Sequence, residues 1–194
     1  MNYRNLSIQK YMNELSSAKP IPGGGSAAAL VGAIGISLSL MVANITLKKV
    51  GNRGQKKLKI YIKKLKQFKK QISHLIDKDP KVYKRVINSY NLSRENPQRM
   101  VRIENALVAS YNVMKQLCVD LCTVHDINSD IFSISRGAIL NDVCVSEAFI
   151  KAALSSAIST ASLNAEYVKN KRIKKRLLDE LQRIDNKRKK RRLK

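Results

Sequence analysis

The sequence lacks several residue types that mark secreted or all-β proteins. Its 194 residues include no tryptophan, four prolines, eight glycines and three cysteines. Scarce proline and glycine disfavour an all-β sandwich, whose many turns need them. Three cysteines cannot all pair, so a disulfide scaffold is disfavoured and a reducing, cytoplasmic compartment is expected. The first 15 residues lack a basic segment followed by an apolar one, so no signal peptide is predicted.

Acidic residues are also few, with 14 Asp and Glu against 38 Lys and Arg, for a net charge of +24. The excess is concentrated in two segments. Residues 48–70 hold 11 basic and no acidic residues, and residues 169–194 hold 14 basic and 3 acidic residues. Together they carry 22 of the 24 net charges. We therefore predict a near-neutral domain over residues 1–168 and a basic tail over residues 169–194.

Apolar residues recur at helical spacing along most of the chain, and no period-2 strand pattern extends beyond a few residues. The fold class predicted is all-α, an antiparallel bundle of five or six helices with a basic C-terminal tail. Asp79 is placed as an N-cap, with Pro80 at the first position of a new helix. The expected helices cover residues 2–17, 27–46, 54–76, 80–90, 97–124 and 143–168, with an irregular connection at 131–136.

Residues 20–47 contain no charged residue, so a transmembrane helix is one interpretation. Its serines, Asn44 and Thr46 dilute the hydrophobicity, and the sequence pattern shows no second span of this kind. The central helix of a soluble bundle is also apolar all round, and we favour that interpretation with no membrane contact. Such a helix needs cover on every side. A homodimer with residues 26–46 near the interface is therefore expected.

The sharpest local motif runs from Pro20 to Ser26 and contains three consecutive glycines at the expected start of a helix. Free N–H groups at a helix start attract anions, and glycine allows a ligand to approach the backbone closely. The alternative is a flexible linker. The prolines directly before the glycines make that alternative weaker. Pro22, Gly23, Gly24, Gly25 and Ser26 are candidate substrate-binding residues.

With the helix that follows and with the segment Met41–Thr46, this motif resembles the cyclodeaminase/cyclohydrolase family. The family includes formimidoyltetrahydrofolate cyclodeaminase domains and bacterial methenyltetrahydrofolate cyclohydrolases. The resemblance covers about residues 5–168 and is strongest over residues 20–49. Further matching elements are Lys48 and Lys49, the segment Leu75–Asp79 with Tyr83, the pair Asn141 and Asp142 with Val145, and Asn164.

The resemblance implies an enzyme of folate one-carbon metabolism, with a tetrahydrofolate derivative as substrate and no metal or cofactor. It implies that Asp79 and Asp142 are catalytic, since a carboxylate can move a proton at N5 or N10 of the folate. Both aspartates also fit helix caps, which is the simpler interpretation. Lys49, Asn141 and Asn164 join the glycine motif as implied substrate-binding residues.

Some positions depart from the family pattern. Asn141 stands where the family has serine, Thr160 replaces an asparagine, and Ile139 occupies a position that can be polar or a thiol in deaminase members. The choice between cyclohydrolase and cyclodeaminase stays open. A family member that has lost the chemistry and binds a ligand or nucleic acid through its basic surface is the alternative function.

Two other patterns in the sequence are candidates for binding sites. Cys118, Cys122 and His125 have a spacing that could ligate zinc, but the apolar residues around them favour a core stripe, and no metal is predicted. The cluster 187–192 is of the kind that binds phosphate backbones. No aromatic residue is interleaved with it, and a solubilising tail is favoured over nucleic-acid binding.

Overall fold

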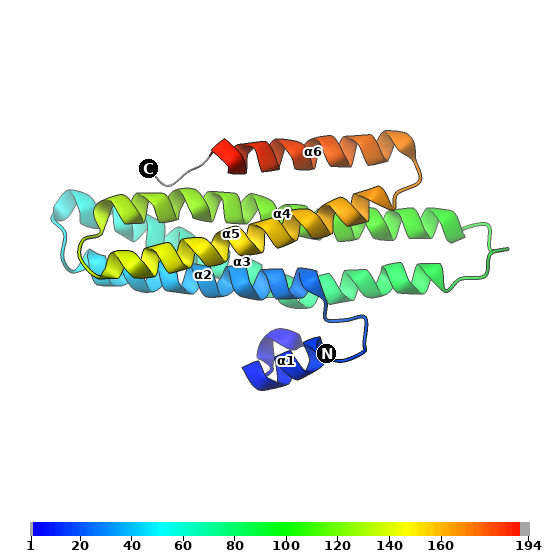
Figure 1. Cartoon of the computed structure of the whole chain (residues 1–194), viewed down its shortest axis with the longest axis horizontal. Helices are drawn as coiled ribbons and strands as arrows, with labels where there is room; N and C mark the ends of the chain where they lie inside the picture. Colours follow the sequence, from blue (N-terminus) through cyan, green and yellow to red (C-terminus); the bar gives the residue numbers. More distant parts are fainter. Residues whose placement is uncertain (1, 191–194) are drawn as a thin grey trace.

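A computed structural model describes residues 2–190 of the chain, and their regular structure is entirely helical (Figure 1). The prediction of an all-α bundle with five or six helices is confirmed, and residues 2–190 contain no strand. A 3-10 turn at Tyr3–Asn5 precedes six α-helices: α1 (Ile8–Leu15), α2 (Gly24–Leu47), α3 (Asn52–Tyr90), α4 (Arg99–Ile134), α5 (Ile139–Glu166) and α6 (Lys171–Lys190).

Four long helices, α2 to α5, form the antiparallel bundle, and short connections join each helix to the next (Figure 1). α2 packs against α3 and α5, and α4 packs against the same two helices. α6 lies along α4 and α5 at one edge, whereas the short α1 projects from the opposite edge beside the start of α2. The central core therefore lies between α2, α3, α4 and α5.

Small residues bring α2 close to α5. A Cβ placed on Gly35 would lie 3.2 Å from the Ser146 carbonyl oxygen and 3.1 Å from a side-chain carbon of Ile150. A Cβ on Gly32 would meet Leu121 of α4 at 3.1 Å and Ala153 of α5 at 3.5 Å. Because interiors are close-packed, larger residues at these positions would push the helices apart. The glycines thus explain how an apolar helix fits at the centre of the bundle.

The prediction that a new helix starts at Pro80 is wrong. α3 is continuous from Asn52 to Tyr90, with Pro80 buried inside it and Asp79 within the helix rather than at its cap. Proline supplies no backbone N–H, so the carbonyl of Ile76 has no helical donor. The Ser26 hydroxyl donates to that carbonyl at 2.8 Å. A neighbouring helix therefore supplies the hydrogen bond that Pro80 removes.

Two other predicted boundaries are also wrong. α4 continues to Ile134, because buried Ile127 and Ile131 extend its apolar stripe through the expected irregular connection. α5 begins at Ile139 and has Ala138 as its N-cap, so Asp142 lies in the first turn and is not the cap. A carboxylate there still interacts favourably with the helix dipole.

Residues 171–190 of the predicted basic tail form α6, whose Leu177 and Leu181 are buried against the bundle. The Tyr111 hydroxyl of α4 donates to the Leu177 carbonyl at 2.7 Å, and Lys115 pairs with Glu180 at 2.9 Å. Residues 191 and 192 of the predicted phosphate-binding cluster lie outside the described residues. The division into a domain and a tail at residue 169 stays a prediction.

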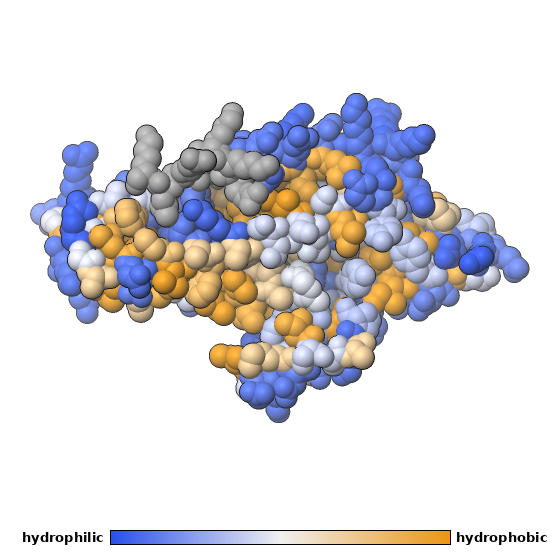
Figure 2. All heavy atoms as spheres, in the orientation of Figure 1, coloured by the Kyte–Doolittle hydropathy of each residue, from blue (hydrophilic) through white to orange (hydrophobic). Residues whose placement is uncertain are grey.

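Both α2 and α5 are long and apolar enough to cross a membrane by length and composition. The sequence pattern had indicated only the first. Most of the apolar window of α2 is buried inside the bundle, as expected for a core helix, while less than half of that of α5 is buried. The two helices lie side by side and share an exposed face (Figure 2).

Candidate active site

A cavity of about 270 Å³ opens where the glycine motif meets the middle of α3 and the last turns of α5. It brings together the start of α2 and residues that lie far apart in the sequence. Its lining residues are Pro20, Ile21, Gly23, Gly24, Gly25, Asp79, Tyr83, Ser110, Ser159, Thr160, Leu163 and Asn164.

Asp79 forms one wall of this cavity and is 6% exposed. Its carboxylate lies directly against the first turn of α2, since a Cβ on Gly25 would fall 2.4 Å from Oδ1 and 2.8 Å from Oδ2. Only glycine permits this approach at position 25. The sequence motif thus positions a carboxylate at a helix N-terminus, where sequence reasoning had expected an anionic ligand.

Burial raises the pKa of Asp79 from 3.8 to about 6, and a hydrogen bond from the Ser26 backbone N–H opposes the rise. No ion pair with Asp79 occurs among residues 2–190. Asp77, two residues earlier, differs because Arg4 pairs with it at 3.2 Å. A buried carboxyl group with a pKa near neutrality can both accept and return a proton.

The Ser26 side chain links the glycine motif to α1 and α3 by hydrogen bonds. Its hydroxyl donates to the Ile76 carbonyl and therefore accepts the hydrogen bond that joins it to Tyr11 Oη at 2.9 Å. Ser26 and Pro22 are buried and do not line the cavity. Neither residue is therefore placed to contact a substrate in the cavity directly.

Asn164 closes the cavity on the α5 side. Its Nδ2 donates to Ser110 Oγ of α4 at 3.0 Å, and both side chains are buried. Thr160, one turn earlier, also lines the cavity, although it departs from the family pattern. The cavity therefore presents amide and hydroxyl groups opposite the Asp79 carboxylate.

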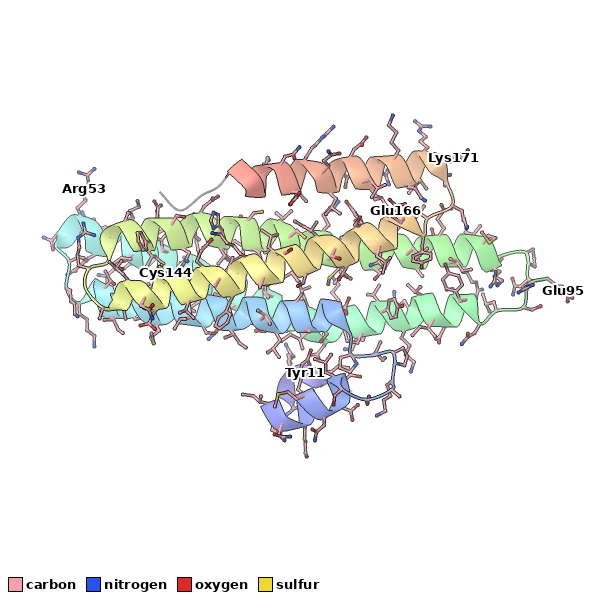
Figure 3. The ribbon with its side chains drawn as sticks, in the orientation of Figure 1. Tyr11, Arg53, Glu95, Cys144, Glu166 and Lys171 are labelled. Atoms are coloured by element: carbon pink, nitrogen blue, oxygen red, sulfur yellow. The ribbon has the colours of Figure 1, made fainter. Side chains whose placement is uncertain are left out.

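The structure does not bring Asp142, Asn141 or Lys49 to this cavity. They lie at the other end of α2 and α5, the end marked by Cys144 in Figure 3, whereas the cavity lies toward Glu166. At 1.5 Å per residue, the 24 residues of α2 separate the two ends by about 36 Å. Within one chain, the predicted site residues therefore lie in two groups, one at the cavity and one at the other end of α2 and α5.

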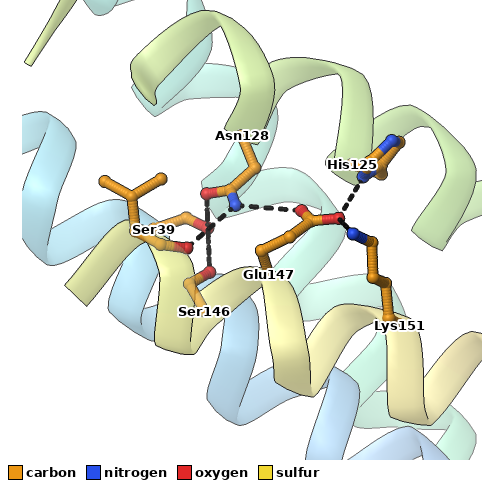
Figure 4. A network of polar contacts seen from close by, with 7 residues as sticks. Ser39, His125, Asn128, Ser146, Glu147 and Lys151 are labelled. Atoms are coloured by element: carbon orange, nitrogen blue, oxygen red, sulfur yellow. Dashed lines mark hydrogen bonds and ion pairs between the residues drawn. The ribbon is translucent and has the colours of Figure 1, made fainter. Parts of the chain in front are cut away.

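The predicted alternative of a zinc site meets no support in the geometry. His125 Nδ1 lies 2.5 Å from Glu147 Oε1, at ion-pair distance (Figure 4). Cys118 and Cys122 are buried on α4. Residues 2–190 contain no group of three His, Cys, Asp or Glu side chains placed to hold a metal ion.

A second hollow of about 350 Å³ continues from the cavity along α3 and α5. The two share Tyr83, Leu163 and Asn164. Tyr90 and Tyr167 lie further along, so three tyrosine rings line the hollow. Their size and flat faces suit an aromatic ligand.

The sequence profile of the formiminotransferase-cyclodeaminase family matches residues 7–183. The chain belongs to this family. The match includes the glycine motif, Asp79, Asn164 and most of α6.

Two proteins of known name resemble the chain over nearly its whole length. A methenyltetrahydrofolate cyclohydrolase of Methylorubrum extorquens is 27% identical over 183 residues, which cover 92% of this chain and 88% of that protein. The crystal structure of formiminotetrahydrofolate cyclodeaminase from Thermotoga maritima superposes with a TM-score of 0.86 at 20% identity, covering 94% of this chain and 90% of that one. The latter shows a shared fold.

Sequence reasoning missed Ser110 and Ser159 as cavity residues. Ser110 lies in the middle of α4 and meets Asn164 only because α4 and α5 pack together. The sequence around Ser110 contains no motif that would indicate a cavity residue. Ser159 lies next to Thr160 among several similar small residues, which hides it as well.

Proposed function

We propose that the chain is a folate one-carbon enzyme that hydrolyses the bridge of 5,10-methenyltetrahydrofolate. The observation that carries the proposal is Asp79, a buried carboxylate without an ion-pair partner in the described residues, at the wall of a cavity built by the glycine motif. The 27% identical cyclohydrolase supports this reaction.

The methenyl bridge is a cationic amidinium group whose carbon accepts a water molecule. In the proposed step, the ionised Asp79 takes a proton from water as the oxygen bonds to that carbon. Asp79 then returns the proton to N5 as the bond between carbon and N5 breaks. The hydroxyl group on that carbon releases its own proton to solvent, which leaves a formyl group on N10. A pKa of about 6 keeps most Asp79 ionised at neutral pH while leaving it acidic enough to return the proton.

The carboxylate has a second role in this proposal. Its negative charge lies beside the cationic bridge in a poorly solvated cavity, where electrostatic attraction is stronger than in water. Asn164, Ser159 and Thr160 offer hydrogen bonds to the polar edge of the pterin ring. The hollow lined by Tyr83, Tyr90 and Tyr167 then accepts the aminobenzoyl ring.

Cyclisation of 5-formimidoyltetrahydrofolate with loss of ammonia is the second candidate reaction. It is favoured by the fold shared with the cyclodeaminase. N10 attacks the formimidoyl carbon and its proton passes to the imino nitrogen. Asp79 in its protonated form supplies a second proton to that nitrogen, and the bond between the carbon and the nitrogen breaks to release ammonia. We propose no metal or redox cofactor for either reaction and a cytoplasmic location.

An absorbance assay of the purified protein with each folate tests the proposal. Loss of the methenyl chromophore, faster than in buffer and saturable with substrate, supports the hydrolase. Appearance of that chromophore from the formimidoyl compound supports the deaminase. No turnover of either, with binding of RNA or DNA at physiological salt, would favour the non-catalytic alternative through the basic surface.

A further inference from the structure

The outer face of α3 carries many basic side chains and no exposed acidic one. The helix contains 13 Lys and Arg residues and two aspartates among its 39 residues. All 13 basic residues are exposed, whereas Asp77 and Asp79 are buried. α3 packs against α2, α4 and the 3-10 turn, and the rest of its surface faces solvent with a charge of one sign.

Five of these lysines form one continuous stripe along the first half of the helix. They recur at alternating spacings of three and four residues, so they lie on the same side of α3. At 1.5 Å per residue, the first and last of them are about 21 Å apart along the helix axis. The lysine stripe consists of Lys56, Lys59, Lys63, Lys66 and Lys70.

The lysine stripe has no ion-pair partner within residues 2–190. The neighbouring α2 contains no charged residue, and Asp130 of α4 pairs with Lys57, which lies outside the stripe. Like charges three or four residues apart on a helix repel each other and lower its stability. A row of charges that costs stability and has no partner in the described chain suits a surface that meets an anion.

The other basic helix, α6, differs in this respect. Its sequence places Asp179 and Glu180 among the basic residues, and Lys115 of α4 pairs with Glu180 at 2.9 Å. Lys174 pairs with Glu166 at 3.3 Å. Positive charge on α6 is therefore partly balanced by carboxylates, whereas that of the lysine stripe is not.

The proposed folate substrate does not account for the lysine stripe. The hollow that continues from the Asp79 cavity is lined by Tyr83 and Tyr90, which lie toward the C-terminal end of α3. Lys70 precedes Tyr83 by 13 residues, which corresponds to about 20 Å along the helix. An anionic glutamate tail that follows the hollow would run away from the stripe. The lysine stripe therefore requires a different anion.

We propose that the lysine stripe binds the phosphate backbone of double-stranded DNA, without sequence preference, as a second function of the chain. Duplex DNA carries one charge per about 1.7 Å of its axis, so about 12 phosphate charges lie within the length of the stripe. Each lysine that neutralises a phosphate releases condensed counterions, which drives association. A lysine is a flexible point charge that only donates hydrogen bonds, so the stripe contacts phosphates rather than reading base edges.

The side chains around the stripe favour duplex DNA over a single strand or a lipid surface. Proteins bind single strands by stacking bases on exposed aromatic rings, but Tyr61 and Phe68 are half-buried, and Tyr61 donates a hydrogen bond to Asp130. Helices that lie in a membrane surface insert large apolar side chains into lipid. Between residues 53 and 70 the exposed large apolar side chain is Ile60 alone, because the apolar side of α3 is buried in the bundle.

Fluorescence anisotropy of the full chain with a labelled DNA duplex of arbitrary sequence tests the proposal. We expect a Kd of about 10⁻⁴–10⁻⁶ M at physiological salt, the range of binding without sequence preference. If five lysines contact phosphates, the Kd should rise about 500-fold between 50 and 200 mM KCl. No binding at the lower salt concentration, or an affinity that salt does not change, would overturn the proposal.

Two variants with the same loss of charge locate the binding surface. The stripe variant replaces its five lysines by glutamine, which has a similar helix propensity. The control variant replaces five exposed basic residues of α6 by glutamine: Lys171, Arg172, Lys175, Arg176 and Arg183. In the stripe variant the slope of log K against log salt should become shallower by about 4 to 5, while the control should keep most of the wild-type slope. Equal losses in the two variants would show that net charge, rather than the lysine stripe, attracts DNA.

Two further probes distinguish other anions. Tighter binding to vesicles of equal parts phosphatidylcholine and phosphatidylserine than to DNA would overturn the choice of partner, as would tighter binding to an RNA duplex. Folate turnover in the stripe variant should equal that of the wild type, because the stripe does not line the cavity. Reduced turnover with unchanged DNA binding would show that the stripe serves the folate instead. The DNA measurements do not depend on the reaction catalysed, so their failure would leave the proposed function intact.

Discussion

Two of the four buried carboxylates in the described residues, Glu147 and Asp79, have contrasting surroundings. Glu147 of α5 is enclosed by partners: His125 at 2.5 Å, Lys151 at 3.3 Å and the Asn128 amide at 3.1 Å (Figure 4). The network extends through Asn128 to Ser39 and Ser146, and none of these residues lines the Asp79 cavity. Asp79 forms no ion pair within the described residues, accepts a hydrogen bond from the Ser26 backbone N–H, and faces a cavity.

The comparison distinguishes a carboxylate enclosed by ionic and amide partners from one that faces a cavity. A buried charge that is paired and hydrogen-bonded fixes the register of the helices around it. A buried carboxylate without a cation holds its proton more tightly and stays available to a ligand. Burial alone therefore does not single out a candidate catalytic carboxylate, whereas burial beside a cavity and without a cation partner does.

Asp79→Asn should have the largest effect of the variants considered. Turnover should fall by about 10²–10⁴-fold, because asparagine cannot carry the proton. Stability should not fall with it. The folded-state pKa of about 6 lies above the unfolded value of 3.8, so ionisation costs stability as pH rises between these values. At pH 7.5 the variant should gain up to about 3 kcal/mol in urea unfolding. Wild-type turnover in this variant would remove Asp79 from the mechanism.

Glu147→Gln, in contrast, should lower the stability of the protein and leave its turnover unchanged. Replacing the carboxylate by an amide should lower the free energy of unfolding by about 1–3 kcal/mol, since the buried donors around Glu147 then lose one of its two acceptor oxygens. The fraction that remains folded should keep its turnover number. Urea unfolding and active-site-normalised kinetics measure the two effects. A large loss of turnover with unchanged stability would show that the network takes part in catalysis.

Gly25→Ala and Gly24→Ala form a matched pair at the start of α2. The Cβ at position 25 would overlap the Asp79 carboxylate, while the Cβ at position 24 would meet its nearest neighbour, Thr160 Oγ1, at 3.9 Å. We expect Gly25→Ala to lower turnover by about 10²-fold through displacement of the carboxylate. Gly24→Ala should stay within a few-fold of wild type. Equal effects of the two substitutions would mean that the contact with Asp79 does not matter.

The smallest effect that we expect is the dependence of wild-type kcat/KM on pH. If ionised Asp79 is the base, kcat/KM should reach a plateau above pH 6 and fall about tenfold per pH unit well below it. Steady-state kinetics between pH 4.5 and 8 would show this limb. A limb near pH 4 instead would indicate a solvent-exposed carboxylate.

The fold class and half of the candidate site could be predicted from the sequence. Helical periodicity indicated the bundle, and the family resemblance singled out Asp79, the glycines and Asn164. Ser110 and the placement of Asp142 could not be predicted, because they depend on how the helices pack. Pro80 misled the prediction because local rules place proline at a helix start, whereas a hydroxyl 50 residues away compensates for it here.

Because the Ser26 hydroxyl replaces the N–H donor that Pro80 lacks, substitutions at positions 26 and 80 should depend on each other during evolution. The Ser26 hydroxyl is required by the Ile76 carbonyl only while residue 80 is proline. Any other residue at position 80 would bring its own N–H to that carbonyl, and the Ser26 hydroxyl would then serve only the Tyr11 hydroxyl. Across related proteins, serine or threonine at position 26 and proline at position 80 should therefore be gained and lost together.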